Sequence, residues 1–88
     1  MVIYKIQWKH SAVKELKRID KVNRIAIIES VQSLSSNPRK VGVKKLIGSE
    51  RTFRLRVRNY RVVFEILDDI LLIDIIRVKH RKDVYKKL

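Results

Sequence analysis

Hydrophobic and polar positions alternate along the first residues of the chain. A period of two places successive side chains on opposite faces of an extended strand, and one of those faces is wholly apolar here. The pattern therefore predicts a β-strand over residues 2–8 with one buried face. The apolar positions of that face are Val2, Tyr4, Ile6 and Trp8.

The period becomes helical after residue 11. Val13, Leu16 and Ile19 are spaced to share one face of a short helix. Ser11 stands before them, and a serine hydroxyl accepts a hydrogen bond from a free amide in the first turn of a helix. We expect Ser11 to be the N-cap of this helix.

A second helix is predicted directly afterwards, with Asp20 as its N-cap. Its apolar stripe continues from Val22 to Leu34 and stops before Pro38, because the residue preceding a proline is driven out of helical geometry. The two helices should form a hairpin. Residues 39–52 then contain both glycines between basic clusters, which indicates an irregular connection with at most a turn of structure near residues 44–47.

The rest of the chain predicts three antiparallel strands, over residues 53–58, 60–67 and 70–78. The turns between them fall at Arg58-Asn59 and Asp68-Asp69, since Asn and Asp tolerate the positive φ of tight hairpins. Two-residue turns fix the opposed pairs of one apolar face, against which the helical hairpin should pack. The expected pairs are Val57 with Tyr60, Leu55 with Val62, Phe53 with Phe64, Val62 with Ile75 and Phe64 with Ile73.

The other face of these strands carries an unusual amount of positive charge. Arg56 and Arg61 become direct cross-strand neighbours, with Arg54 one step along the same face. Like charges opposed on a sheet are destabilising, and a bound polyanion would compensate for the repulsion. The predicted face consists of Arg54, Arg56, Arg61, Val63, Glu65, Leu72, Asp74, Ile76 and Val78.

Composition supports a basic binding protein of one domain, residues 1–88. The chain has 22 Lys and Arg against 9 Asp and Glu, and its formal charge of +13 is typical of nucleic-acid binding, although an acidic protein partner would benefit equally. Cysteine is absent and only two histidines are present, so we expect no metal and no disulfide. No signal peptide or long apolar run is recognisable, and the predicted location is the cytoplasm, without membrane contact.

The chemistry-bearing residues converge at one end of the predicted sheet. Because the last strand runs antiparallel to its neighbour, its end lies beside Tyr60 and Arg61, and His80, Arg81 and Tyr85 follow directly. Several cations, an imidazole and a phenol are a suitable set for RNA cleavage, in which a 2′-hydroxyl loses a proton, the 5′-oxygen gains one and a phosphorane is neutralised. The scheme requires no cofactor.

The sequence resembles the RelE/ParE superfamily of toxin–antitoxin toxins over essentially its whole length, and most closely the RelE branch. The most specific elements are KLIG leading into FRLRVRNYRVVFEI, and the closing HRKDVY. The resemblance implies an α+β fold of order β-α-α-β-β-β, with a helical hairpin on one face of an antiparallel sheet. It also implies a ribosome-dependent endonuclease that cuts mRNA in the ribosomal A site, without a metal or small-molecule cofactor, and that is silenced by a RelB-like antitoxin.

The resemblance also assigns roles to individual residues. It matches Arg54, Arg56 and Arg61 to basic positions of the family, Tyr85 to its tyrosine, and Arg81, or equally His80, to its C-terminal basic position. From these matches we assign phosphate clamping to the three arginines, a further phosphate contact to Arg81, and stacking or orientation of the nucleotide to Tyr85. Where the usual pattern has lysines, this chain has arginines, and a guanidinium with a pKa above about 12 is no general base at neutral pH. The role of general base is therefore assigned to His80, with Glu65 as the alternative. The expected RNA contacts are Lys44, Lys45, Arg58, Lys79 and Lys82.

Two other functions remain open from the sequence. The ParE branch shares the fold but poisons gyrase, and its members generally lack the assembled basic, histidine and tyrosine set. A non-catalytic RNA-binding module is the other alternative, because a charge of +13 supplies affinity through counterion release alone.

Overall fold

The computed structural model describes residues 2–83, and its core is a five-stranded sheet with two helices. The strands are β1 (Lys5–Trp8), β2 (Val43–Lys45), β3 (Thr52–Val57), β4 (Tyr60–Leu67) and β5 (Leu72–His80). The helices are α1 (His10–Lys17) and α2 (Lys21–Gln32), and short 3-10 turns occupy η1 (Ser33–Ser35) and η2 (Asp68–Ile70).

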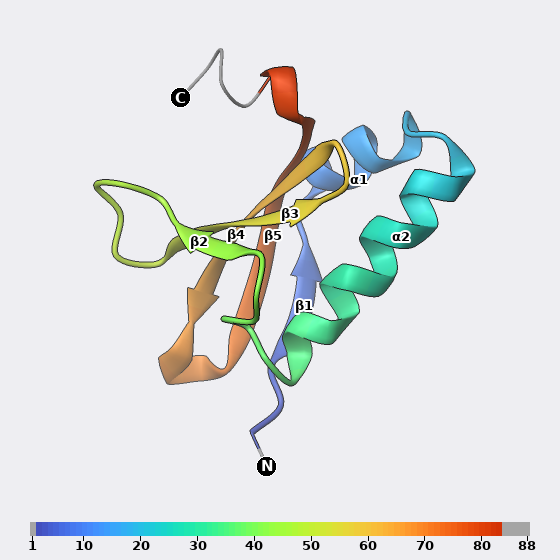
Figure 1. Ribbon diagram of the computed structural model, residues 1–88. Coiled ribbons are helices and arrows are strands. Elements are labelled where there is room, and N and C mark those ends of the chain that lie inside the picture. Colours follow the sequence, from blue (N-terminus) through green and yellow to red (C-terminus); the bar gives the residue numbers. More distant parts are fainter. Residues whose placement is uncertain (1, 84–88) are drawn as a thin grey trace.

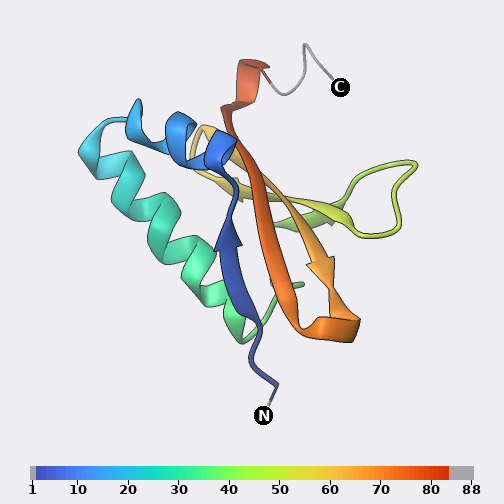
Figure 2. The same cartoon turned by 180° about the vertical axis from the view of Figure 1, so that it is seen from behind.

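The strand order is β1-β5-β4-β3-β2, with β1 parallel to β5 and every other neighbour antiparallel. Both helices lie on one side of the sheet, and the other face is left without a covering element among residues 2–83 (Figures 1 and 2). This arrangement confirms the predicted α+β class. It also confirms the helical hairpin, which packs on one sheet face and leaves the cationic face open.

The first strand and the first cap differ from the prediction. β1 begins at Lys5 instead of residue 2, because its parallel partner β5 begins only at Leu72. The N-cap of α1 is Lys9, which makes no side-chain cap hydrogen bond. Ser11 lies inside the helix, and its hydroxyl donates to the carbonyl oxygen of Ile76 at 2.8 Å, so a tertiary contact takes the group that local pattern assigned to capping.

The predicted N-cap of α2 is confirmed. The carboxylate of Asp20 accepts from the backbone N–H of Asn23 at 3.1 Å and from the side-chain amide of Asn23 at 2.8 Å. The hydrogen bonds from Asn23 favour the charged carboxylate and lower the pKa of Asp20. The apolar stripe of α2 carries on into η1 and ends before Pro38, as predicted.

β2 was predicted as irregular chain. Its three residues pair with β3 in the register Val43 with Leu55, Lys44 with Arg54 and Lys45 with Phe53. A segment of three residues is too short to show a period of two, and its extended form depends on the free edge of β3. This correction places Lys44 beside Arg54 on the open face.

The β3–β4 hairpin has the predicted two-residue turn and register. Val57 pairs with Tyr60, Leu55 with Val62 and Phe53 with Phe64, and Arg56 directly opposes Arg61. Arg58 adopts a φ of 55° in the turn. Left-handed geometry in the turn matches the right-handed twist of the flanking strands, but it falls on Arg58 and not on Asn59, the residue type expected to tolerate it.

The β4–β5 connection is longer than predicted, and the register was wrong. Instead of a two-residue turn, η2 and Leu71, with φ of 51°, separate the strands, so Phe64 pairs with Ile75. A bulge between Val63 and Phe64 adds a further shift, and Val62 pairs with Val78. Val78, which was predicted on the cationic face, consequently lies in the core and is only 3% exposed.

Val78→Ala tests this corrected face. Deleting two methyl groups from a buried site should cost about 2 kcal/mol of unfolding free energy through lost burial and a residual cavity. Val63→Ala, at a half-buried position on the open face, should cost less. Urea denaturation of both variants measures the difference. Equal losses would contradict the face assignment.

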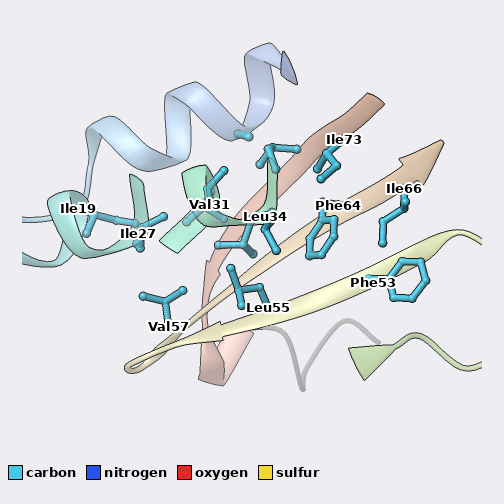
Figure 3. Close-up of a cluster of buried hydrophobic side chains, with 14 residues drawn as sticks. Ile19, Ile27, Val31, Leu34, Phe53, Leu55, Val57, Phe64, Ile66 and Ile73 are labelled. Carbon is cyan, nitrogen blue, oxygen red and sulfur yellow. The ribbon is translucent and has the colours of Figure 1, made fainter. Parts of the chain in front are cut away.

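The core lies between the helices and the inner sheet face (Figure 3). Phe64, Ile27, Leu34, Leu55, Ile73, Ile75, Val31 and Val62 are its largest fully buried side chains. The rings of Phe53 and Phe64 stack with centroids 6.0 Å apart. Tyr60 and Trp8 pack against this cluster, as predicted.

Candidate functional site

The open face of the sheet gathers cations from four strands. Backbone register sets Lys44 of β2 beside Arg54 of β3, and Arg56 of β3 beside Arg61 of β4. Lys79 of β5 is the next neighbour of Arg61. The alternation of side chains along each strand keeps these residues on one face, so the predicted cationic face exists as a contiguous surface.

A pocket of about 190 Å³ opens on this surface. Its lining combines one glycine with four cationic side chains, and such a hollow attracts a phosphate group more strongly than any single surface lysine would. The lining residues are Gly42, Lys44, Arg54, Arg56 and Arg61. The pocket brings together the three predicted phosphate-clamping arginines and one of the predicted RNA contacts.

Arg61 is the most constrained member of the pocket. Arg61 is only 8% exposed, and its guanidinium donates to the carbonyl oxygens of Tyr60 at 2.9 Å and Arg58 at 3.1 Å. These two acceptors hold the planar fork before any ligand arrives. A preoriented donor stabilises developing negative charge with little reorganisation.

The loop before β2 forms the pocket wall. Gly42 has a φ of 98°, a conformation that side-chain-bearing residues rarely adopt. Its carbonyl oxygen accepts from the backbone N–H of Arg56 at 3.0 Å. The glycine therefore allows the loop to close on β3 beside two of the pocket arginines.

A second hollow of about 430 Å³ continues from the pocket along β2 and is lined by Lys44, Lys45, Leu46, Ile47 and Arg54. Lys45, one of the predicted RNA contacts, lines this hollow and pairs in register with Phe53. The side chain of Ile47 is fully exposed. The hollow therefore combines cationic and apolar surface.

His80 lies elsewhere. It pairs with Tyr60, its ring meets the Tyr60 ring edge-on at 5.4 Å, and its Nδ1 accepts from the backbone N–H of Lys82 at 3.3 Å. The pocket around it is lined by Glu15, Arg18, Ile19, Tyr60, Val78, Lys79, His80 and Asp83, and it includes none of the three arginines that line the first pocket. The structure thus brings the predicted cations together but places His80 beside Tyr60, towards the helices.

The remaining predicted residues surround the same end of the sheet. Arg58 donates from its guanidinium to the side-chain oxygen of Asn23 at 3.2 Å, which ties the β3–β4 turn to α2. The backbone N–H of Arg81 donates to the carbonyl oxygen of Asn59 at 2.8 Å, and Arg81 and Lys82 are exposed. Tyr85 falls outside the described residues.

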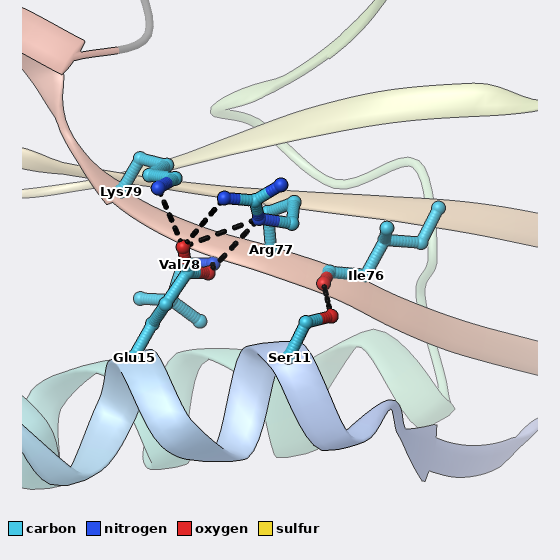
Figure 4. A network of polar contacts seen from close by, with 6 residues as sticks. All are labelled: Ser11, Glu15, Ile76, Arg77, Val78 and Lys79. Carbon is cyan, nitrogen blue, oxygen red and sulfur yellow. Dashed lines mark hydrogen bonds and ion pairs between the residues drawn. The ribbon is translucent and has the colours of Figure 1, made fainter.

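Glu15 and Arg77 were not among the predicted site residues. The Glu15 carboxylate accepts from Arg77 at 2.9 Å, from the Lys79 ammonium at 2.7 Å and from the backbone N–H of Val78 at 2.8 Å (Figure 4). Periodicity assigns Glu15 only to a polar helix face. Its partners lie more than 60 positions away, so no local signal reveals them.

Partial burial of the Glu15 carboxyl disfavours its charge, but hydrogen bonds from Arg77, Lys79 and the Val78 amide outweigh that effect and lower its pKa below the ordinary 4.5. Because the pKa of Glu15 is lower in the folded protein, its ionisation stabilises the fold at any pH above the pKa that the group has in the unfolded chain. The contribution is lost as the pH falls through the lowered pKa. Glu15 is therefore charged at neutral pH.

The described residues contain no group of three potential ligands able to hold a metal ion. Within residues 2–83, no helix is long and apolar enough to cross a membrane.

Comparison with known proteins identifies the family. Residues 6–85 match the family model described as ParE toxin of type II toxin-antitoxin system, parDE. Toxin RelE3 of Methanocaldococcus jannaschii is 34% identical over 85 residues, which cover 92% of this chain and 94% of the relative. Putative toxin RelE1 of the same organism is 28% identical, covering 94% of this chain and 96% of the relative.

Solved structures agree with these sequence matches. The toxin–antitoxin complex RelBE2 from Mycobacterium tuberculosis contains a chain with a TM-score of 0.81 and 28% identity, covering 91% of this chain and 100% of that one. The archaeal RelE-RelB complex from Pyrococcus horikoshii gives a TM-score of 0.79 and 27% identity, covering 92% and 97%. The family model, the sequence relatives and the fold together show that this chain belongs to the RelE/ParE superfamily of type II toxin–antitoxin toxins.

Proposed function

We propose that this protein is an endoribonuclease toxin that cleaves mRNA in the ribosomal A site and so inhibits translation. The observation that carries the proposal is the pocket lined by Lys44, Arg54, Arg56 and Arg61 on the open sheet face. A phosphodiester seated there meets guanidinium forks suited to bidentate contact with phosphate oxygens. The RelE-type relatives favour the same activity.

In the proposed reaction, the RNA 2′-hydroxyl attacks the adjacent phosphorus and the 5′-oxygen leaves. Negative charge builds on the phosphorane oxygens, and the arginines neutralise it, with Arg61 already oriented by two backbone carbonyls. Arg81 adds a phosphate contact and Tyr85 orients the nucleotide. Lys45, Arg58, Lys79 and Lys82 provide contacts to ribosomal and messenger RNA through charge.

Proton transfer has two candidate groups. His80 serves only if the RNA passes around the end of β4 at Tyr60, because the imidazole lies outside the arginine pocket. Glu65 lies on the same face as the arginines, opposite Thr52 and Asp74. His80→Ala and Glu65→Gln separate them, since the variant that loses most cleavage while retaining ribosome binding identifies the group.

We also propose that a RelB-like antitoxin neutralises the protein in the cytoplasm. Solved structures of RelE relatives include complexes with RelB partners, and a chain of charge +13 attracts an acidic segment. Leu72, Ile76 and Val78 were the apolar residues near the basic face that such a segment was expected to cover, but Val78 is buried in the core. The hollow containing Lys45 and Ile47 offers the cationic and apolar surface instead.

Primer extension on mRNA translated in vitro tests the activity. The protein should produce strong stops at codons in the ribosomal A site, and the same mRNA without ribosomes should stay largely intact. DNA supercoiling by gyrase should be unaffected. Inhibition of gyrase with intact mRNA would instead establish the ParE-type alternative, and tight ribosome binding without cleavage would establish the non-catalytic RNA-binding alternative.

A further inference from the structure

The outer edge of β5 changes partner halfway along the strand. β1 pairs with β5 only from Leu72 to Ile75, whereas β5 continues to His80. The backbone groups beyond Ile75 on that edge need other partners, because unpaired polar groups in a packed strand are costly. The pairing that begins with β1 is continued by α1 (Figure 4).

Side chains of α1 make this continuation. The Ser11 hydroxyl donates to the Ile76 carbonyl oxygen at 2.8 Å, and the Val78 N–H donates to the Glu15 carboxylate at 2.8 Å. Besides accepting this backbone hydrogen bond, the Glu15 carboxylate forms ion pairs with the Arg77 guanidinium and the Lys79 ammonium. Its side chain is only 19% exposed. One carboxylate thus holds three consecutive residues of β5.

Those three residues lie directly before the C-terminal part of the site. Lys79 neighbours Arg61 of the arginine pocket, and the strand ends at His80 beside Tyr60. One residue later, the Arg81 N–H bonds to Asn59 in the β3–β4 turn. The direction in which the chain leaves the sheet therefore depends on how the end of β5 is held.

We propose that Glu15 is a positioning residue for the C-terminal segment of the site, and this inference rests on the proposed nuclease function. Its charge aligns Arg77, Val78 and Lys79, and the aligned strand delivers Arg81 to the phosphate held by Arg61. Attachment of α1 to the sheet does not require this carboxylate, because Ala12 is fully buried and Leu16 packs against the core.

Glu15→Gln is the sharpest test because it keeps the shape of the side chain. The amide oxygen still accepts from the Val78 N–H, but the amide cannot neutralise Arg77 and Lys79. We expect the single-turnover rate of mRNA cleavage at saturating ribosomes to fall about 10- to 100-fold, as small misplacements remote from the reacting atoms do. Ribosome affinity should stay within about threefold, because the arginine pocket is unchanged.

Three further variants serve as controls. Ser11→Ala removes an edge hydrogen bond from the same helix without touching Arg77 or Lys79, and Glu29→Gln removes the same charge from an exposed position on α2. Both should cleave within about twofold of wild type, as expected of surface changes outside the site. Glu15→Asp keeps the charge with a shorter reach and should restore part of the rate.

Amide hydrogen exchange gives a readout independent of activity. The Arg81 amide should exchange faster in Glu15→Gln than in wild type or Ser11→Ala, at a temperature where circular dichroism shows each variant folded. Wild-type cleavage and exchange in Glu15→Gln would overturn the inference, as would equal losses in Ser11→Ala or Glu29→Gln. If the wild-type protein itself does not cleave mRNA, the proposed function is wrong. The exchange rate of the Arg81 amide then still shows whether Glu15 holds the end of β5. If Glu15→Gln does not fold, Glu15→Asp carries both measurements.

Discussion

Arg61→Ala is expected to reduce mRNA cleavage on programmed ribosomes about 100- to 1000-fold, the usual effect of removing one preoriented donor to a transition-state oxyanion. The reason is geometric, because Arg61 is buried, its guanidinium is fixed by the carbonyls of Tyr60 and Arg58, and it lines the pocket. Single-turnover cleavage at saturating ribosomes measures the chemical step. Ribosome affinity, measured separately, should change little.

Two matched variants define what this result means. Arg51→Ala removes the same charge from an exposed position outside the arginine pocket and should leave cleavage nearly unchanged. Arg61→Lys keeps the charge but loses the planar fork, so an intermediate rate is expected. If Arg51→Ala loses as much activity as Arg61→Ala, long-range charge and not the pocket governs cleavage, and the assignment fails. Arg56→Ala, at an exposed position of the same pocket, replaces Arg61→Ala if that variant unfolds.

Phe64→Ala should remove most of the stability of the fold. Phe64 is fully buried in the central strand β4 and stacks on Phe53, and truncating such a residue typically costs about 3–5 kcal/mol. Small domains have total stabilities of about 5–15 kcal/mol, so this change takes a large share. The melting temperature should fall by roughly 15–30 °C.

Ile47→Ala is the control for Phe64→Ala. Ile47 is fully exposed in the connection after β2, so its truncation should change the unfolding free energy by less than about 0.5 kcal/mol. Thermal and urea unfolding of the two variants can be compared directly. A loss below about 1 kcal/mol for Phe64→Ala would show that the core is not organised around β4.

The β3–β4 hairpin illustrates what local pattern predicts well. Alternation assigns the faces of both strands, and a two-residue turn leaves one register, so Arg56 opposes Arg61 as expected. The N-cap of α2 was equally predictable from the sequence, because Asp20 accepts its capping hydrogen bond from Asn23, only three residues away. Both features are settled by interactions between near neighbours in the chain.

β5 illustrates what local pattern misses. Its register depends on η2, on the left-handed Leu71 and on the bulge opposite Val63, and these moved Val78 into the core. A bulge is favourable only when the completed sheet and the packed helices define the two faces. The same shift sets His80 against Tyr60, apart from the arginines with which the sequence had grouped it.

By itself, the sequence determined the family, the α+β class, the cationic face and the trio Arg54, Arg56 and Arg61, because alternation and short turns are encoded by adjacent residues. Only the tertiary structure decided that Lys44 completes the pocket, that His80 lies outside it and that Glu15 holds the end of β5. Those outcomes depend on which strand edges remain free once the sheet closes. The pairing of strand edges joins residues far apart in the chain, so the local hydrophobic periodicity of the sequence cannot predict it.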